Sequence, residues 1–304
     1  MYKLLTRSLV HLLTTSPSKP SPDDIAGGQA VIEGVMMRRA NKIATAVRRP
    51  DQTIVIQERE RVPFTKRYKV LGLPFVRGAV TLVEMLGVGI STLMFSAEQA
   101  LTEDDKKPGK WEMPVSMVIS FTVSIALFVV FPAYCFSLLR DMVSNTILLN
   151  VIEGALRLSI FLIFLLSTLF MEDMRRVFMY HGAEHKTVFA WENGDALTVE
   201  NVKKFSTRHP RCGTSFLLVV MVVSILVFSL LGRPDFLHRI LYKLLLFPVV
   251  AGISYEIIRF TGKHREWKWV QLLSAPGLLL QRITTREPTD DQIEVAIAAM
   301  ERVI

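Results

Sequence analysis

Long apolar stretches alternate with polar, charged segments along this chain of 304 residues. Three of the stretches are apolar and long enough to cross about 30 Å of hydrocarbon as helices. A fourth carries its charges near its ends, where long side chains reach the membrane surface. The pattern predicts a mainly α membrane protein with four transmembrane helices, at Pro114–Leu139, Val151–Met171, Thr214–Leu231 and Leu237–Ile258.

The segment that precedes these spans has the pattern of β-structure. Gly27–Arg38 is a strand-like run framed by glycines, and Lys42–Val47 with Thr53–Gln57 predicts a hairpin that turns at Pro50. The Gly27-Gly28 pair is not followed by the Lys-Ser/Thr of a phosphate-binding loop. We expect it to form a turn with positive φ instead. A small cytoplasmic β-containing region therefore precedes the membrane.

Residues 76–100 are apolar but include Arg77, Glu84 and three glycines. This pattern fits an interfacial or re-entrant helix, or a fifth span whose polar groups face protein. We prefer the interfacial or re-entrant interpretation, because one more crossing would invert every later loop and place the basic ones outside.

The distribution of positive charge predicts the orientation of the chain in the membrane. Residues 1–113 hold 17 of the 36 Lys and Arg residues, the 172–213 connection holds 7, and the part after Ile258 holds 7. Both termini and the 172–213 loop are therefore expected in the cytoplasm of a multi-pass cell-membrane protein. The net charge of +8 is explained by anionic lipid at that face, and no recognition motif for nucleic acid is present.

Five regions follow from these patterns. They are an amphipathic N-terminal segment (1–22), a cytoplasmic β-rich region (23–66), an interfacial or re-entrant helical region (67–113), a four-helix transmembrane domain with a cytoplasmic loop at 172–213 (114–258), and a cytoplasmic C-terminal helical tail (259–304). The tail contains a capping box at Thr289–Gln292, and its apolar face is expected to pack on the cytoplasmic region.

The sequence His181-Gly182-Ala183-Glu184-His185 places two imidazoles and a carboxylate on one helical turn. Residues four apart share a helix face, so His181 and His185 can bind one divalent metal ion, which we expect to be zinc, with Glu184 as the proton acceptor. This is the H-x-x-E-H form of a zinc-peptidase signature. The alternative is a solvated helix face without metal. No proline interrupts Val151–Trp191, which predicts one continuous helix from the second span to the motif.

Three further residues are candidates to complete the metal site. His209 and Cys212 carry zinc-binding atoms just before the third span, but Pro210 and Gly213 also fit a simple turn there. Glu256 lies near the cytoplasmic end of the fourth span, and H-x-x-E-H peptidases take a third ligand from a later helix. Its alternative role is an ion pair with Arg259 or Lys263.

Five segments together resemble the YqhQ-like family of bacterial integral membrane proteins, whose members are described as predicted metal-dependent enzymes of unestablished function. The segments are GGQAVIEGVMMR from Gly27, YHGAEHK from Tyr180, HPRCGTSF from His209, FPVVAGISYE from Phe247, and PGLLLQ with TTREP between Pro276 and Pro288. The resemblance implies a membrane location and a metal, without a substrate.

Two functions that use a metal ion remain open from the sequence, besides a membrane scaffold without metal. The first is a membrane-bound, metal-dependent hydrolase that acts at the cytoplasmic membrane face on a peptide or a lipid-linked substrate. The second is a non-catalytic scaffold or transporter component in which His181, His185, His209 and Cys212 enclose a structural metal ion. Either function is compatible with a homo-oligomer in the lipid bilayer.

Overall fold

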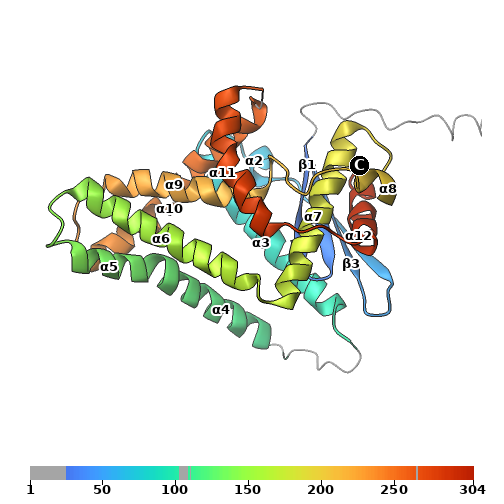
Figure 1. Cartoon of the computed structure of the whole chain (residues 1–304), viewed down its shortest axis with the longest axis horizontal. Coiled ribbons are helices and arrows are strands. Elements are labelled where there is room, and N and C mark those ends of the chain that lie inside the picture. Colours follow the sequence, from blue (N-terminus) through green and yellow to red (C-terminus); the bar gives the residue numbers. More distant parts are fainter. Residues whose placement is uncertain (1–24, 103–108, 110, 265) are drawn as a thin grey trace, which may run out of the picture. The chain divides into compact units, whose positions relative to one another are not determined.

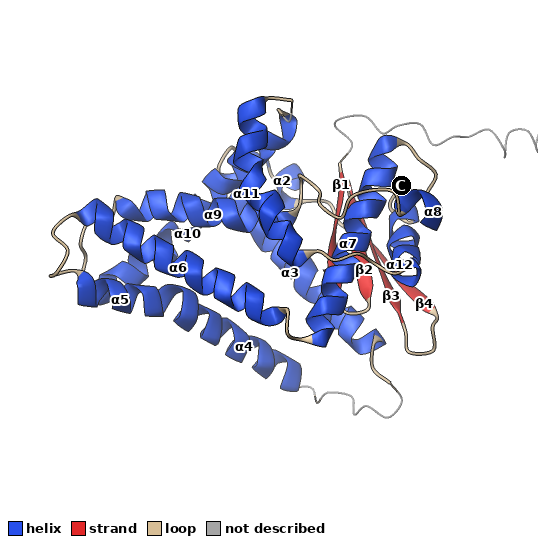
Figure 2. Cartoon of the chain, viewed as in Figure 1, coloured by secondary structure: helices blue, strands red, loops and turns tan. Residues whose placement is uncertain are grey.

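The computed structural model describes residues 25–102, 109, 111–264 and 266–304. The predicted amphipathic segment 1–22 lies outside these residues. The described chain is mainly helical and carries one small antiparallel sheet, which confirms the predicted fold class at that level (Figure 2). It divides into two compact units of discontinuous segments. Of the described residues, unit 1 contains those in 25–61, 176–209 and 285–304, and unit 2 contains those in 62–175 and 210–284.

Unit 1 is built on a four-stranded antiparallel sheet whose strands follow chain order. The predicted hairpin is present, and its turn is held by Asp51, whose carboxylate accepts hydrogen bonds from the backbone N–H and the hydroxyl of Thr53. These bonds lower the pKa of Asp51. The strands are β1 (Ala26–Val31), β2 (Gly34–Arg39), β3 (Lys42–Arg48) and β4 (Ile54–Glu60).

The prediction of a glycine turn at Gly27-Gly28 is wrong. Both residues lie inside β1, where they pair with Arg38 and Met37 of β2, and neither has a positive φ. The chain turns further on, between β1 and β2, where Glu33 has φ 50°. Gly28 instead lies close to the backbone of β2, where a side chain would not fit. A Cβ there would lie 2.5 Å from the Met36 carbonyl oxygen.

Three helices complete unit 1 around a shared core. Side chains of Val35, Met37, Ala44 and Ala46 point to one face of the sheet and are buried together with α7 and α12 residues. The C-terminal helix therefore packs on the sheet, as its apolar pattern predicts. The predicted capping box is also present, with Thr289 and Gln292 as its members. The helices are α7 (Glu172–Asn193), α8 (Val199–Val202) and α12 (Asp290–Glu301).

Unit 2 consists of helices only, in the part that the structure describes. Helix α10 packs against α3 and α9, while α6 packs against α5 and α9 (Figure 1). The helical segments are α2 (Phe64–Arg67), η1 (Lys69–Gly72), α3 (Val76–Gln99), α4 (Glu112–Ile125), η2 (Ala126–Val130), α5 (Phe131–Leu139), α6 (Thr146–Thr168), α9 (Gly213–Ser229), α10 (Phe236–Lys263) and α11 (Lys268–Thr284).

Four helices of unit 2 are long and apolar enough to cross a membrane, but they are not the same four as predicted. Pro114–Leu139, Thr146–Thr168 and Phe236–Lys263 correspond to three predicted spans. The fourth is Val76–Gln99, an unbroken helix with mean hydropathy 1.7. The predicted span Thr214–Leu231 is a shorter apolar helix, Gly213–Ser229.

The expected continuous helix from Val151 to Trp191 is interrupted. Helix α6 ends at Thr168 and α7 begins at Glu172, with Leu169, Phe170 and Met171 between them. Their backbone N–H groups bond three residues back, to Leu166, Ser167 and Thr168, which is the tightened geometry of a helix end. No proline or glycine causes this break, so the apolar pattern could not reveal it.

Candidate functional site

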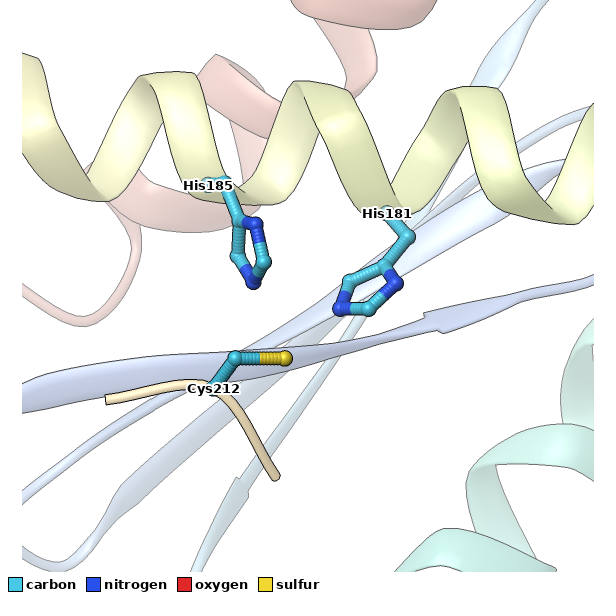
Figure 3. Close-up of side chains that lie close together, drawn as sticks. All are labelled: His181, His185 and Cys212. Atoms are coloured by element: carbon cyan, nitrogen blue, oxygen red, sulfur yellow. The ribbon is translucent and has the colours of Figure 1, made fainter. Parts of the chain in front are cut away.

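Helix α7 carries the two histidines of the motif on one face. His181 and His185 are four residues apart, and their ring centroids are separated by 4.4 Å. Their side chains project from the same side of the helix (Figure 3). His185 is 2% exposed and His181 is partly exposed, so one ring is enclosed by protein while the other is open on one side.

The small residues between the histidines let the chain pass close to α7. A Cβ on Gly182 would lie 2.0 Å from the carbonyl oxygen of Arg286, and the Arg286 N–H donates to the carbonyl of Phe178. Ala183 is fully buried in the core of unit 1. The segment that leads into α12 therefore crosses α7 at the middle of the motif and fixes its position.

The backbone of Thr207 orients the ring of His185. Nδ1 of His185 lies 2.5 Å from the Thr207 carbonyl oxygen, which only accepts hydrogen bonds, so Nδ1 carries the proton. Nε2 then carries the lone pair, which is the form that binds a metal ion. A ring nitrogen held by a carbonyl is the usual support for a histidine ligand.

Glu184 is buried beside the histidines. Its carboxylate lies 3.5 Å from His185 Nε2 and accepts a hydrogen bond from the Gly28 N–H of β1. A Cβ on Gly28 would lie 2.7 Å from the Glu184 Cγ, so only glycine allows this approach. Burial raises the pKa of Glu184, and His181, His209 and the Gly28 N–H oppose that shift.

Cys212 supplies a sulfur atom to the same group. One potential ligand atom each from His181, His185 and Cys212 lie within 4.8 Å of one another (Figure 3). Cys212 is 8% exposed and precedes α9 as its N-cap, where its Sγ lies 3.4 Å from the Thr214 N–H. It follows His209 by three residues, so chain connectivity alone keeps their Cα atoms within about 11 Å.

His209 is close to the group but does not belong to the three. Its ring centroid lies 5.8 Å from that of His185 and 4.3 Å from that of Phe189. Its Nε2 lies 3.5 Å from the Oε1 atom of Glu192. Glu192 stands at the end of α7 and could have been considered from its spacing, since it follows His185 by seven residues on the same face.

Glu256 has a different partner from those that the sequence offered. In α10 its carboxylate accepts hydrogen bonds from Arg77 Nε at 2.7 Å and Arg77 Nη2 at 2.5 Å. The backbone N–H of Phe75 donates to it as well, at 3.2 Å. Both carboxylate oxygens therefore bond to groups of unit 2, and the ion pair of Glu256 with Arg77 joins α10 to α3.

Sequence reasoning missed two groups that surround the motif, the Gly28 N–H and the Thr207 carbonyl. Both belong to the backbone, and backbone roles leave no residue-type signal in a sequence. The double glycine was visible, but its role in admitting Glu184 depends on a contact between residues more than 150 positions apart.

Comparison with known proteins gives two matches. Residues 73–304 match the family described as "Protein of unknown function (DUF1385)". The chain is also 36% identical over 295 residues to "Uncharacterized protein YqhQ" of Bacillus subtilis (strain 168), and this similarity covers 91% of the chain and 92% of that protein. No solved structure matches.

Proposed function

The chain belongs to the DUF1385 family of YqhQ-like proteins, and from its site we propose that it is an integral membrane protein with metal-dependent hydrolase activity. His181, His185 and Cys212 are the proposed metal ligands. Glu184 is the proposed proton acceptor.

One observation carries this proposal, namely the convergence of two imidazole nitrogens and one thiol sulfur within 4.8 Å. Nitrogen and sulfur ligands at such spacing suit zinc, which binds histidine at about 2.0–2.1 Å and cysteine at about 2.3 Å. The protonated Nδ1 of His185 supports the same assignment, because it directs Nε2 toward a ligand role.

The surroundings of the three residues fit a catalytic site better than a structural one. Structural zinc sites have four protein ligands, whereas catalytic sites have three and keep one position for water. His209, the natural fourth ligand, has its Nε2 3.5 Å from Glu192. His181 is partly exposed, which gives a substrate a side from which to approach.

A bound zinc ion would act as a Lewis acid and make a water molecule more acidic. The protein supplies the remaining chemistry. Glu184 lies next to the ligands and accepts a proton at its carboxylate, while the Gly28 N–H holds that carboxylate in place. A raised pKa suits a group that must both take up and release a proton.

The membrane part of the proposal rests on four helices with mean hydropathy of 1.6 to 2.3. Large apolar side chains are exposed along them, for example Val83, Ile119 and Ile163, as expected for surfaces that contact lipid. With the positive charges as described, unit 1 faces the cytoplasm. The substrate is a peptide or a lipid-linked molecule.

The second candidate function is a scaffold or transporter component with a structural metal ion. It requires His209 to turn from Glu192 and become the fourth ligand. The observation that favours it is that the centroids of the His185 and His209 rings lie 5.8 Å apart. A rotation of the His209 side chain would bring both rings to one metal ion.

Elemental analysis of the detergent-purified full chain tests the proposal. We expect about one zinc ion per chain in the wild type and in Glu184→Gln, and loss of the metal in His181→Ala and His185→Ala. A wild-type protein without stoichiometric transition metal would remove both candidate functions.

The His209→Ala variant separates the two candidates. The hydrolase proposal expects metal content close to wild type, because His209 is not a ligand, whereas the loss of a buried ring packed on Phe189 lowers the Tm in either case. A structural site expects loss of metal and a folding defect, because its coordination shell would be open.

A further inference from the structure

A second cluster of charged side chains lies inside unit 2. Glu153 of α6 is 4% exposed and forms ion pairs with three cations. One is Arg157, one turn further along α6, and the others are Arg239 and Lys243 of α10. Arg239 is 0% exposed and Lys243 is 3% exposed, so both cations are buried among the helices of unit 2.

The charges of this cluster do not balance. Among the residues that the structure describes, three cations surround one carboxylate, which leaves two positive charges in excess. An arginine does not lose its proton in a protein, so at least one excess charge remains even if Lys243 is neutral. A buried charge without a counter-charge costs several kcal/mol. Water molecules could satisfy hydrogen bonds here but could not supply the missing negative charge.

The hydrogen bonds identify which cations are incompletely used. The guanidinium of Arg157 has three hydrogen-bond acceptors, because it donates to the Phe128 carbonyl, to the Ser224 hydroxyl and to Glu153. Its guanidinium therefore belongs to the packing of α6 against its neighbours.

Arg239 and Lys243 have donors to spare. Arg239 uses Nε and Nη2 on Glu153 and Asn150, but its buried Nη1 has no acceptor among the described residues. Lys243 has three ammonium protons and bonds one described acceptor, Glu153. Both spare donors lie beside the same carboxylate.

The cluster lies close to one end of these helices. Arg239 is three residues after the start of α10, and Lys243 and Glu153 are each seven residues after the start of their helices. At 1.5 Å per residue the depths are about 5 Å and 10 Å. If α6 and α10 cross a bilayer, as the proposed function requires, these depths match the zone where lipid phosphates meet the hydrocarbon.

We propose that Arg239 and Lys243 form an anion site inside the helices of unit 2, which binds a phosphate group beside Glu153. Arginine and lysine are the residues that bind phosphate in proteins, through charge-assisted hydrogen bonds. The phosphate is either the headgroup of an anionic lipid or a free inorganic ion. The lipid source rests on the membrane location, whereas the ion source does not, and neither requires the metal centre.

Thermal unfolding of the full chain tests this site with two probes. The protein is measured in detergent with increasing inorganic phosphate, and in nanodiscs of phosphatidylcholine with or without phosphatidic acid. We expect one probe to raise the wild-type Tm in a saturable manner. Stabilisation by phosphatidic acid alone identifies a lipid headgroup, and stabilisation by inorganic phosphate in detergent identifies a free ion.

Two variants and a matched control locate the effect. Arg239→Gln and Lys243→Met each remove one cation and leave Glu153 with two, and the Tm of each variant without a probe reports on its folding. Each should weaken the apparent affinity for the probe by at least about tenfold. Lys263→Met removes one exposed positive charge from the other end of α10 and should bind like the wild type, while Lys243→Arg should retain binding.

Two results would overturn the anion site. One is a wild-type Tm that responds to neither probe. The other is equal stabilisation of the wild type, Arg239→Gln and Lys243→Met, which would show that the anion acts elsewhere. Because the metal ligands are intact in every variant, zinc content reports on the proposed hydrolase separately.

Discussion

At the scale of single residues, Gly182 determines how closely the segment before α12 approaches the histidines. A methyl group at Gly182 would meet the Arg286 carbonyl oxygen at 2.0 Å, a distance that neither backbone can accommodate without moving. We expect Gly182→Ala to destabilise unit 1 by about 1–3 kcal/mol, as overpacking does. Thermal unfolding monitored by circular dichroism measures this.

Gly27→Ala is the control for Gly182→Ala. Gly27 also belongs to unit 1, but a Cβ there would meet nothing within 4 Å. The Tm of the Gly27→Ala variant should stay within a degree or two of that of the wild type, or rise slightly. Equal Tm values for the two variants would show that the close approach at Gly182 is unimportant.

The residue scale also shows what the motif alone could predict. The spacing of His181 and His185 was sufficient to place them on one face, because the helix period is a local property. The position of Glu192 on the face of His185 was visible in the sequence, but its contact with His209, like that of Arg77 with Glu256, is made only in the folded chain. The assignment of metal ligands stays a prediction.

At the scale of elements, residues close together in the sequence correctly indicated where a hairpin turns and where a helix begins. The β3–β4 hairpin and the capping box of α12 were both expected from residues within a few positions of each other. The break between α6 and α7 was missed. Arg175 Nε, from the first turn of α7, donates to the Leu169 carbonyl and so caps the end of α6.

The capping box of α12 gives a prediction at this scale. The Thr289 side chain and the Gln292 side chain each bond the other's backbone N–H at the start of the helix. Thr289→Ala should reduce the stability of unit 1 by about 0.5–2 kcal/mol, and Thr289→Ser should preserve it. The Tm of the two variants measures the difference. Identical values would mean that the cap does not support α12.

At the scale of the whole molecule, unit 1 would constrain the path of the chain through the membrane that we propose. Its three segments share one core, in which Ala26, Tyr180 and Ile293 are buried together, and a bilayer cannot separate them. If the chain is inserted in a membrane, it must therefore cross an even number of times between unit 1 segments. Between residues 61 and 176 the described chain has three long apolar helices, at 76–99, 114–139 and 146–168.

One of these three helices is therefore expected to stay on the unit 1 side. Helix α3 has the lowest mean hydropathy of the three, 1.7 against 2.3 and 2.0, and carries Arg77 and Glu84. The length of α3 permits a crossing, but an even number of crossings requires that one helix does not cross, which favours an interfacial position for α3. No property of α3 considered alone would lead to this conclusion.

Labelling of single cysteines in sealed membrane vesicles tests the path of α3. In a Cys135→Ala background, Tyr68→Cys and Trp111→Cys flank the helix at positions that are 50% and 79% exposed. We expect both to react with a membrane-impermeant maleimide from the same side. Buried Cys212 in the parent protein gives the background signal. Reaction from opposite sides would contradict the parity argument.

If two imidazoles and one thiolate share a metal ion, X-ray absorption spectroscopy of the zinc-loaded full chain will detect them together. We expect a first shell with one sulfur at about 2.3 Å and nitrogen from imidazole at about 2.0–2.1 Å, with the sulfur absent in Cys212→Ser. A shell of oxygen atoms without sulfur or imidazole scattering, unchanged in that variant, would contradict it.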